Sequence, residues 1–326
     1  MQVRIASIFS RSWKPSGPTA IVSPTPTRLQ ILLAFAAIYL IWGTTFLGIA
    51  LVLRSLPPFA SASLRFLIAG SLLLIWLHLR DPRPLAGLPL PRVALCGVLL
   101  LSGGNGLVVW AQQGVPSGVA ALVIASMPVA VLVLQRAFFG HRLPQWRVLA
   151  GIVVGLCGVL LIVSQIGRLS GAVRPLHVIS LLGAVFAWAL GTLLHRGVPL
   201  NRVLASAGVQ MLVGGAVLGL MALPGGEWTR LDLARVSLTS LAALAYLIVF
   251  GSIVAQGSYL WLLGHVAPQK VATYALVNPV VAMALGALVL NEKLNALAGV
   301  AVLLVLVGVA LVLWPAGHGA GGRARD

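Results

Sequence analysis

The chain has 326 residues, of which 60% are hydrophobic and 8% charged, and its net charge is +17. A soluble protein carries about a quarter charged residues, so this composition excludes an ordinary soluble domain. Runs of about twenty apolar residues separate the arginines, which also excludes a soluble nucleic-acid-binding protein. We therefore interpret the positive charge as arginines in loops that hold the cytoplasmic side of a membrane protein.

Apolar runs of spanning length fill most of the chain. Residues 1–28 are basic and are followed by a full span rather than a short signal-peptide core, so we predict a cytoplasmic tail. Ten apolar runs follow, at residues 29–53, 59–79, 92–111, 117–138, 147–166, 177–195, 203–223, 237–259, 267–290 and 296–314. Most reach the roughly 20 residues that a bilayer requires. The sequence thus predicts an all-α membrane protein with ten transmembrane helices and a second cytoplasmic tail at residues 315–326.

The basic residues predict how the chain lies in the membrane. When the N-terminus is placed inside, most Lys and Arg residues fall in segments on the cytoplasmic side. This is the asymmetry that the positive-inside rule describes. We therefore expect both termini in the cytoplasm.

The two halves of the chain resemble each other. Segments 116–129 and 268–281 both begin with a proline at the head of an apolar run, and each carries a second proline further in, Pro128 or Pro279. Near mid-bilayer a proline removes a helical hydrogen bond, so we predict a kink or hinge at both. Other motifs recur in the same order, namely Trp42-Gly43-Thr44 with Trp188 to Thr192, Ala60-Ser61-Ala62 with Ala205-Ser206-Ala207, and Ala150-Gly151 with Ala298-Gly299.

Five spans per half is an odd number, so the second half enters the membrane from the opposite side. We predict two inverted five-helix repeats, at residues 29–166 and 167–314, around a central cavity. Kinked helices at matching places in two such halves are typical of a transporter site.

Several motifs resemble one known family. They are Tyr39-Leu40-Ile41-Trp42-Gly43-Thr44-Thr45, Leu64-Arg65-Phe66, Gly104-Asn105-Gly106 and Tyr274-Ala275-Leu276-Val277-Asn278-Pro279-Val280-Val281. The chain resembles the EamA-domain proteins of the drug/metabolite transporter superfamily over residues 30–314, and most of all their YedA-like branch of bacterial inner-membrane exporters. The resemblance implies two five-helix repeats and a cavity lined largely by helices one, three, four, six, eight and nine. It also implies export of small metabolites, amino acids or drugs.

The chain departs from the family pattern at two acidic positions. Gln112 and Gln113 stand where relatives often carry a glutamate, and His141 stands where they commonly have the glutamate that the second half keeps as Glu292. The first departure, at Gln112 and Gln113, weakens an argument for proton coupling through carboxylates. We expect either facilitated diffusion or proton coupling without an Asp/Glu relay.

Polar and aromatic residues within the spans are the candidates for the site, because they are costly in lipid and usually face the bundle interior. Helical spacing gathers several of them onto common faces. The predicted substrate-binding residues are Trp42, Asn105, Gln112, Trp188, Gln256, Tyr259, Tyr274 and Asn278. His195 shares a face with Trp188 and is the candidate proton-linked group.

Each candidate has an alternative role. The tryptophans could be interfacial anchors, and the amides of Gln112, Gln256 and Asn278 could instead form hydrogen bonds between helices. Arg65 lies about two turns inside the second span, and we expect it to extend towards the outer interface rather than contact substrate.

We therefore predict a secondary transporter that exports a small solute across the bacterial inner membrane by alternating access. The expected partners are that small-molecule substrate and the lipid bilayer, without nucleic acid, nucleotide, cofactor or metal, in a monomer or homodimer. A channel-like or structural membrane protein is one alternative, but neither charged rings nor a carbonyl filter is evident in the sequence. A membrane-embedded enzyme is the weakest alternative, because the acids lie outside the spans.

Overall fold

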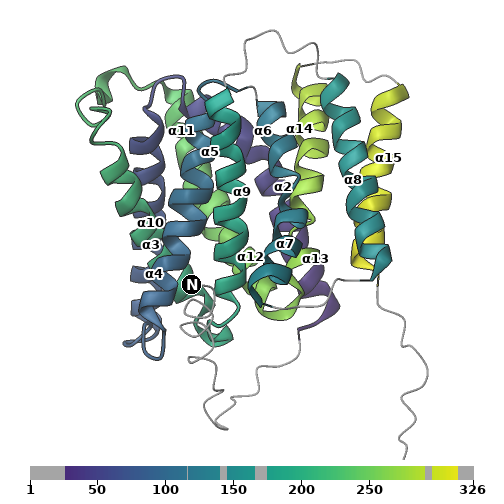
Figure 1. The fold of residues 1–326 in the computed structure, drawn as a ribbon. Coiled ribbons are helices and arrows are strands. Elements are labelled where there is room, and N and C mark those ends of the chain that lie inside the picture. Colours follow the sequence, from purple (N-terminus) through teal and green to yellow (C-terminus); the bar gives the residue numbers. More distant parts are fainter. Residues whose placement is uncertain (1–25, 116, 140–144, 166–174, 291–295, 315–326) are drawn as a thin grey trace, which may run out of the picture.

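The computed structural model describes residues 26–115, 117–139, 145–165, 175–290 and 296–314, and all regular structure within these ranges is helical (Figure 1). The prediction of an all-α chain is confirmed for them. Nearly all of the two predicted tails lies outside the described residues, as do His141 and Glu292.

The described helices follow the predicted spans in order. Their bounds are α2 (Arg28–Val52), α3 (Pro58–Arg80), α4 (Leu90–Gly97), η1 (Val98–Gly106), α5 (Leu107–Ala111), α6 (Ser117–Ile124), α7 (Met127–Phe139), α8 (Trp146–Gln165), α9 (Pro175–His195), η2 (Leu200–Arg202), α10 (Val203–Met221), η3 (Leu233–Arg235), α11 (Leu238–Tyr246), η4 (Leu247–Val254), α12 (Ala255–His265), α13 (Pro268–Val271), α14 (Tyr274–Leu290) and α15 (Ala296–Leu313). By length and composition, six helical stretches among the described residues can cross a membrane: α2, α3, α4 to α5, α9, η2 to α10, and α11 to α12.

Local sequence signals explain where the first helices begin. Thr27 and Gln30 form a reciprocal capping box ahead of α2, in which Thr27 Oγ1 accepts from the Gln30 backbone at 3.2 Å. Proline occupies the first position of α3, where no backbone N–H is needed. The carboxylate of Glu227, from the loop after α10, accepts a hydrogen bond from the Ala60 backbone at 2.8 Å. This negative charge lies at the positive end of the α3 dipole.

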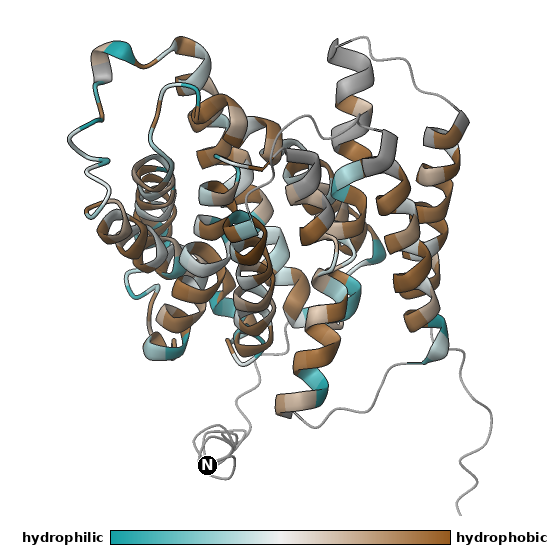
Figure 2. Cartoon of the chain, turned by 45° about the horizontal axis from the view of Figure 1, so that its top comes forward, coloured by the Kyte–Doolittle hydropathy of each residue, from teal (hydrophilic) through white to brown (hydrophobic). Residues whose placement is uncertain are grey.

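Hydrophobic residues predominate along the length of the helices (Figure 2), and many of their side chains face outwards. Large side chains such as Leu33, Leu40, Ile75, Phe186 and Leu303 are each more than a third exposed there. A water-soluble monomer rarely exposes so much contiguous apolar surface, whereas lipid tails cover it without penalty.

Two closely packed helix pairs lie at opposite sides of the bundle. α3 packs along α10, and α8 packs along α15 (Figure 1). A Cβ atom built on Gly70 would lie 2.9 Å from the Gly208 carbonyl oxygen, and one on Gly308 would lie 2.6 Å from the Gly151 carbonyl oxygen. The backbones therefore approach each other so closely that only glycine fits. Such close packing drives helix association in lipid, where the hydrophobic effect contributes little.

Two central stretches have π-helical hydrogen bonding. η1 interrupts the span from α4 to α5, and η4 interrupts the span from α11 to α12. Both stretches contain glycine, with Gly104 in η1 and Gly251 in η4. π-helical turns within α-helices often occur at functional sites.

Helix breaks occur near the predicted proline positions, but at different distances from them. The break between α6 and α7 lies at Ala125 and Ser126, directly before Pro128. The break between α13 and α14 lies at residues 272–273, and α14 continues through Pro279. The side chain of Thr273 stabilises this second break. Its Oγ1 donates a hydrogen bond to the Lys270 carbonyl at 2.6 Å and shares a hydrogen bond of 2.6 Å with the Tyr39 hydroxyl. A hinge role for the two prolines stays a prediction.

We predict that Gly308→Ala destabilises the protein while Gly299→Ala on the same helix does not. The new methyl group at 308 would meet the Gly151 oxygen and the Gly155 backbone at 2.6 Å, whereas a Cβ at 299 meets nothing within 4 Å. Overpacking of this kind costs about 1–3 kcal/mol. Thermal unfolding of both variants in detergent measures the difference. Equal melting temperatures would contradict the described α8–α15 contact.

A pH-dependent contact links the two halves at the end of the bundle where α3 ends. Asp81 accepts a hydrogen bond from the Arg83 backbone at 2.9 Å and forms an ion pair with Arg202. These interactions, the backbone bond first, lower the pKa of the Asp81 carboxyl below its usual range. Because the folded pKa is the lower one, the ionised carboxyl stabilises the fold above the unfolded pKa, and this stabilisation is lost as the pH falls through the folded pKa.

We therefore predict that the melting temperature of wild type exceeds that of Asp81→Asn by a constant margin between about pH 8 and about pH 5. The margin should shrink below about pH 4, where the wild-type carboxyl becomes protonated. Thermal unfolding of both proteins across this range measures it. A margin that persisted unchanged at about pH 2 would show that the charge of Asp81 is irrelevant.

Candidate functional site

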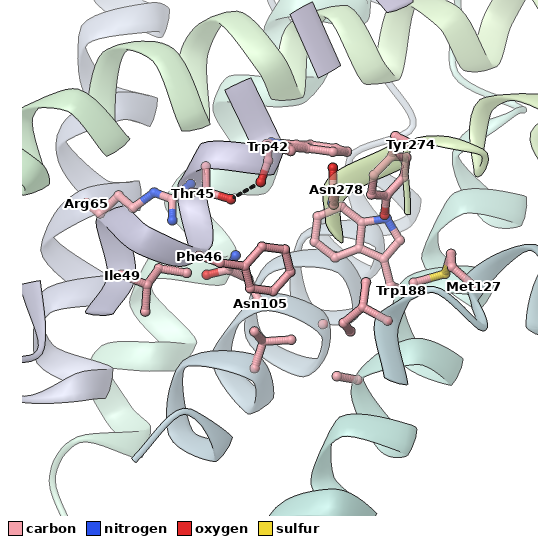
Figure 3. A pocket seen from close by; sticks show the side chains of 14 residues that line it. Trp42, Thr45, Phe46, Ile49, Arg65, Asn105, Met127, Trp188, Tyr274 and Asn278 are labelled. Carbon is pink, nitrogen blue, oxygen red and sulfur yellow. Dashed lines mark hydrogen bonds between the residues drawn. The ribbon is translucent and has the colours of Figure 1, made fainter. Parts of the chain in front are cut away.

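A narrow cavity of about 60 Å³ lies in the middle of the bundle (Figure 3). Its lining comes from α2, α3, η1, α5, α6, α7, α9 and α14, and comprises Trp42, Thr45, Phe46, Ile49, Arg65, Gly104, Asn105, Val108, Ile124, Met127, Ala184, Trp188, Tyr274 and Asn278. Apolar walls with a few amides and one charged group are typical of a small-molecule site.

Four aromatic residues from four helices form one wall of the cavity and its support. The Trp42 ring lies 4.7 Å from Tyr274, 5.0 Å from Tyr259 and 5.5 Å from Trp188, between ring centroids. Each such pair adds about 0.5–1.5 kcal/mol beyond the burial of its area. The cluster therefore ties α2, α9, α12 and α14 together at the site.

Hydrogen bonds fix the orientation of this aromatic cluster. Trp42 Nε1 donates to the Gly251 carbonyl at 3.2 Å, and Trp188 Nε1 donates to the Tyr259 hydroxyl at 3.0 Å. The Tyr259 hydroxyl also bonds Thr192 Oγ1. Polar atoms on buried aromatic rings usually find such partners, and the rings are then held in one rotamer.

Glycine in η1 provides the space for Trp188. A Cβ atom on Gly104 would lie 2.5 Å from Cε3 of the Trp188 ring and 3.3 Å from its Cβ. Any larger residue at 104 would displace the ring from the cavity wall. The position of Trp188 thus depends directly on the absence of a side chain in η1.

Two asparagines present polar groups to the cavity. Oδ1 of Asn105 and Oδ1 of Asn278 are buried, and neither has a hydrogen-bond partner among the described residues. Asn278 is 2% exposed. A buried amide oxygen without a partner costs about 1–3 kcal/mol, so these groups are suited to bind something that enters the cavity.

The structure corrects the expectation for Arg65. Its side chain does not extend to the interface but is 4% exposed, and it lines the cavity. Arg65 Nε donates to Ser252 Oγ of η4 at 2.8 Å, and Ser252 in turn donates to the Leu247 carbonyl at 3.0 Å. The serine in the π-helical stretch therefore draws the guanidinium inwards. The sequence signal that could have placed Arg65 at the site is its charge within an apolar span.

Five of the eight predicted substrate residues meet at the cavity: Trp42, Asn105, Trp188, Tyr274 and Asn278. Tyr259 lies behind them in the aromatic cluster. Gln112 at the end of α5 and Gln256 in α12 do not line the cavity, although each has a buried amide atom without a partner in the described part of the chain. Substrate contact by any of the eight stays a prediction.

His195 lies away from the cavity lining, in the last turn of α9. It is 2% exposed, and its Nδ1 lies 3.0 Å from Gln210 Nε2 of α10. Its hydrogen-bond partner among the described residues is therefore a neutral amide. Its proton-linked role stays a prediction.

Described residues that are helical throughout their regular structure, with an apolar outer surface and a central cavity lined by aromatic and amide groups, have the architecture of a multi-pass membrane transporter. The model of the EamA-like transporter family matches residues 29–164 and 176–314. The chain belongs to this family, and the resemblance found in the sequence is confirmed.

Relatives and a solved structure agree with this assignment. The chain is 37% identical to the uncharacterized inner membrane transporter YedA of Escherichia coli, covering 87% of this chain and 90% of that relative. It is 27% identical to the probable amino-acid metabolite efflux pump of Escherichia coli, covering 83% and 91% of the two chains. A crystal structure shares the fold with a TM-score of 0.68 at 20% identity, covering 88% of this chain and 97% of the other.

We predict that the hydroxyls of Tyr259 and Thr192 are energetically coupled. Tyr259→Phe and Thr192→Val each remove one partner of the bond that the two groups share. The sum of the single losses in stability should therefore exceed the loss in the double variant by about 0.5 kcal/mol or more. Unfolding of the four proteins in detergent gives this coupling. Tyr246→Phe combined with Thr192→Val is the matched control, because Tyr246 bonds Thr44 instead, and additivity is expected.

Proposed function

We propose that the protein is a secondary transporter that exports a small solute across the bacterial inner membrane by alternating access. Two inverted five-helix repeats, residues 29–166 and 167–314, would exchange outward-open and inward-open arrangements around the cavity, with both termini in the cytoplasm. The family membership supports transport, and the similarity to a probable amino-acid metabolite efflux pump supports the direction.

The observation that carries this proposal is a reciprocal contact at the cavity. Trp42 on α2 donates to the carbonyl of Gly251 in η4, and Trp188 on α9 lies against Gly104 in η1. The first helix of each half thus places its tryptophan against a π-helical glycine of the other half. Such reciprocity is what an inverted two-fold relation produces.

The packing of the other helices has the same reciprocity. α2 contacts η4 and α14, and α9 contacts η1 and α7. The second helix of each half pairs with the other in α3 and α10, and the fifth helices pair in α8 and α15. These contacts support a ten-helix arrangement in which every helix has a counterpart in the other half. Among the described residues, six helical stretches have the length and composition of a membrane span.

The size of the cavity supports alternating access. At about 60 Å³, it is well below the ~300–1,000 Å³ of typical small-molecule sites. A solute therefore needs the cavity to widen. The helix breaks at residues 125–126 and 272–273 and the two π-helical stretches provide places where the helices can bend.

The described carboxylates do not indicate a relay for protons through the cavity. The described acids Asp81, Glu227 and Asp232 lie outside the cavity, where they contact Arg202, Ala60 and Arg235. Facilitated transport or coupling to protons without a carboxylate relay both agree with this placement. Transport by proteoliposomes with and without an imposed pH gradient distinguishes the two.

A survival assay tests the proposed function. An overexpressing strain is grown on a panel of toxic amino acids, amino-acid analogues and drugs, and at least one of them should become less toxic. Trp188→Ala should remove this protection, because it deletes a wall of the cavity. Trp146→Ala is the matched control, since Trp146 is 72% exposed at the start of α8 and should keep full protection. If no solute changed survival or efflux, the exporter assignment would fail.

A further inference from the structure

The cavity contains a positive charge that no described protein group neutralises. Arg65 is 4% exposed, and its hydrogen bond within the described residues goes to the neutral hydroxyl of Ser252. The guanidinium also lies 4.8 Å from the centre of the Phe66 ring. None of the three described carboxylates pairs with it. A guanidinium has five N–H donors, so a single hydroxyl leaves most of its binding capacity unused.

Burial makes this arrangement costly for the empty protein. Arg65 lies about 10 Å along α3 from the start of the helix, well inside a span. A charge removed from water at such a place is unfavourable by several kcal/mol unless it is paired. Charged groups inside spans therefore usually mark the path of a substrate or ion.

The remaining polar groups lie beside this charge within the same cavity. Figure 3 shows Arg65 at one side of the cavity and Asn278 among the rings of Trp42, Trp188 and Tyr274 at the other, with Asn105 between the two sides. The Oδ1 atoms of both asparagines are without partners in the described structure. The cavity thus has a cationic end and an aromatic end, and amides lie between them and among the rings.

We propose that Arg65 binds the carboxylate of the transported solute, so that the substrates are small organic acids, amino acids included, with an apolar body that fits the aromatic end. A planar guanidinium matches a carboxylate with two parallel N–H···O bonds. Ser252 holds Nε and positions the guanidinium for this contact. The asparagine amides then bind the polar groups next to the carboxylate. This substrate class rests on the proposed transport function.

Binding to the purified full-length protein in detergent tests the proposal without any transport. The probes are L-phenylalanine and 3-phenylpropionate, which carry the carboxylate, and L-phenylalaninamide and phenethylamine, which lack it. Leucine and leucinamide form a second matched pair. The probes with a carboxylate should bind wild type about tenfold to hundredfold more tightly than the probes of the same apolar body that lack it. Equal binding within the pairs, or no binding of any carboxylate, would overturn the proposal.

Variants then assign the preference to Arg65. Arg65→Gln should abolish it, and Arg65→Lys should keep part of it, because the ammonium retains the charge but not the planar fork. Arg80→Gln is the matched control, since Arg80 is exposed at the far end of the same helix and stacks on Trp76. If Arg65→Gln lowered the melting temperature but left the preference intact, Arg65 would be structural and the proposal wrong.

A further variant keeps the test open if Arg65→Gln does not fold. Ser252→Ala leaves the charge in place and removes the hydrogen bond that orients it. It should weaken carboxylate binding several-fold without changing the binding of the amides. An unchanged affinity for carboxylates in Ser252→Ala, with a folded protein, would contradict the positioning. Failure of the survival assay would remove the transport function instead, so the two hypotheses can fail separately.

Discussion

The contact between each cavity tryptophan and a glycine of the opposite half is the constraint on which the site depends. Trp42 bonds the Gly251 carbonyl, and Trp188 occupies the space that a side chain at Gly104 would fill. Both glycines lie in π-helical stretches. At Gly104 the missing side chain makes room for the Trp188 indole, and at Gly251 the backbone carbonyl accepts from Trp42, so the two contacts together hold the aromatic wall of the cavity.

The bundle around this site is held by a different interaction. In lipid, apolar side chains gain little by leaving their surroundings, so helices associate where their backbones can approach closely. Such approaches occur at the two opposite sides of the bundle, between Gly70 and Gly208 and between Gly151 and Gly308. The closely packed glycines thus lie apart from the cavity, which is lined in part by the broken helices.

The polar groups of the cavity show how function can override stability. Asn105 and Asn278 have buried oxygens without described partners, and Arg65 carries an unneutralised charge. A protein selected for stability alone would pair or replace them. These two amide oxygens and the guanidinium line the same cavity, which supports a binding role for them.

The sequence by itself determined the solvent of this protein, its helical class and its family, because apolar run length and motif order are local properties. It also identified Trp42, Trp188, Tyr274, Asn105 and Asn278, which meet at the cavity. Only the tertiary structure decided the places of the others. The rotation of each helix placed Gln112 and Gln256 outside the cavity lining, and Ser252 of a distant helix drew Arg65 inwards. Such contacts join residues that lie far apart in the chain, so a local sequence pattern cannot predict them.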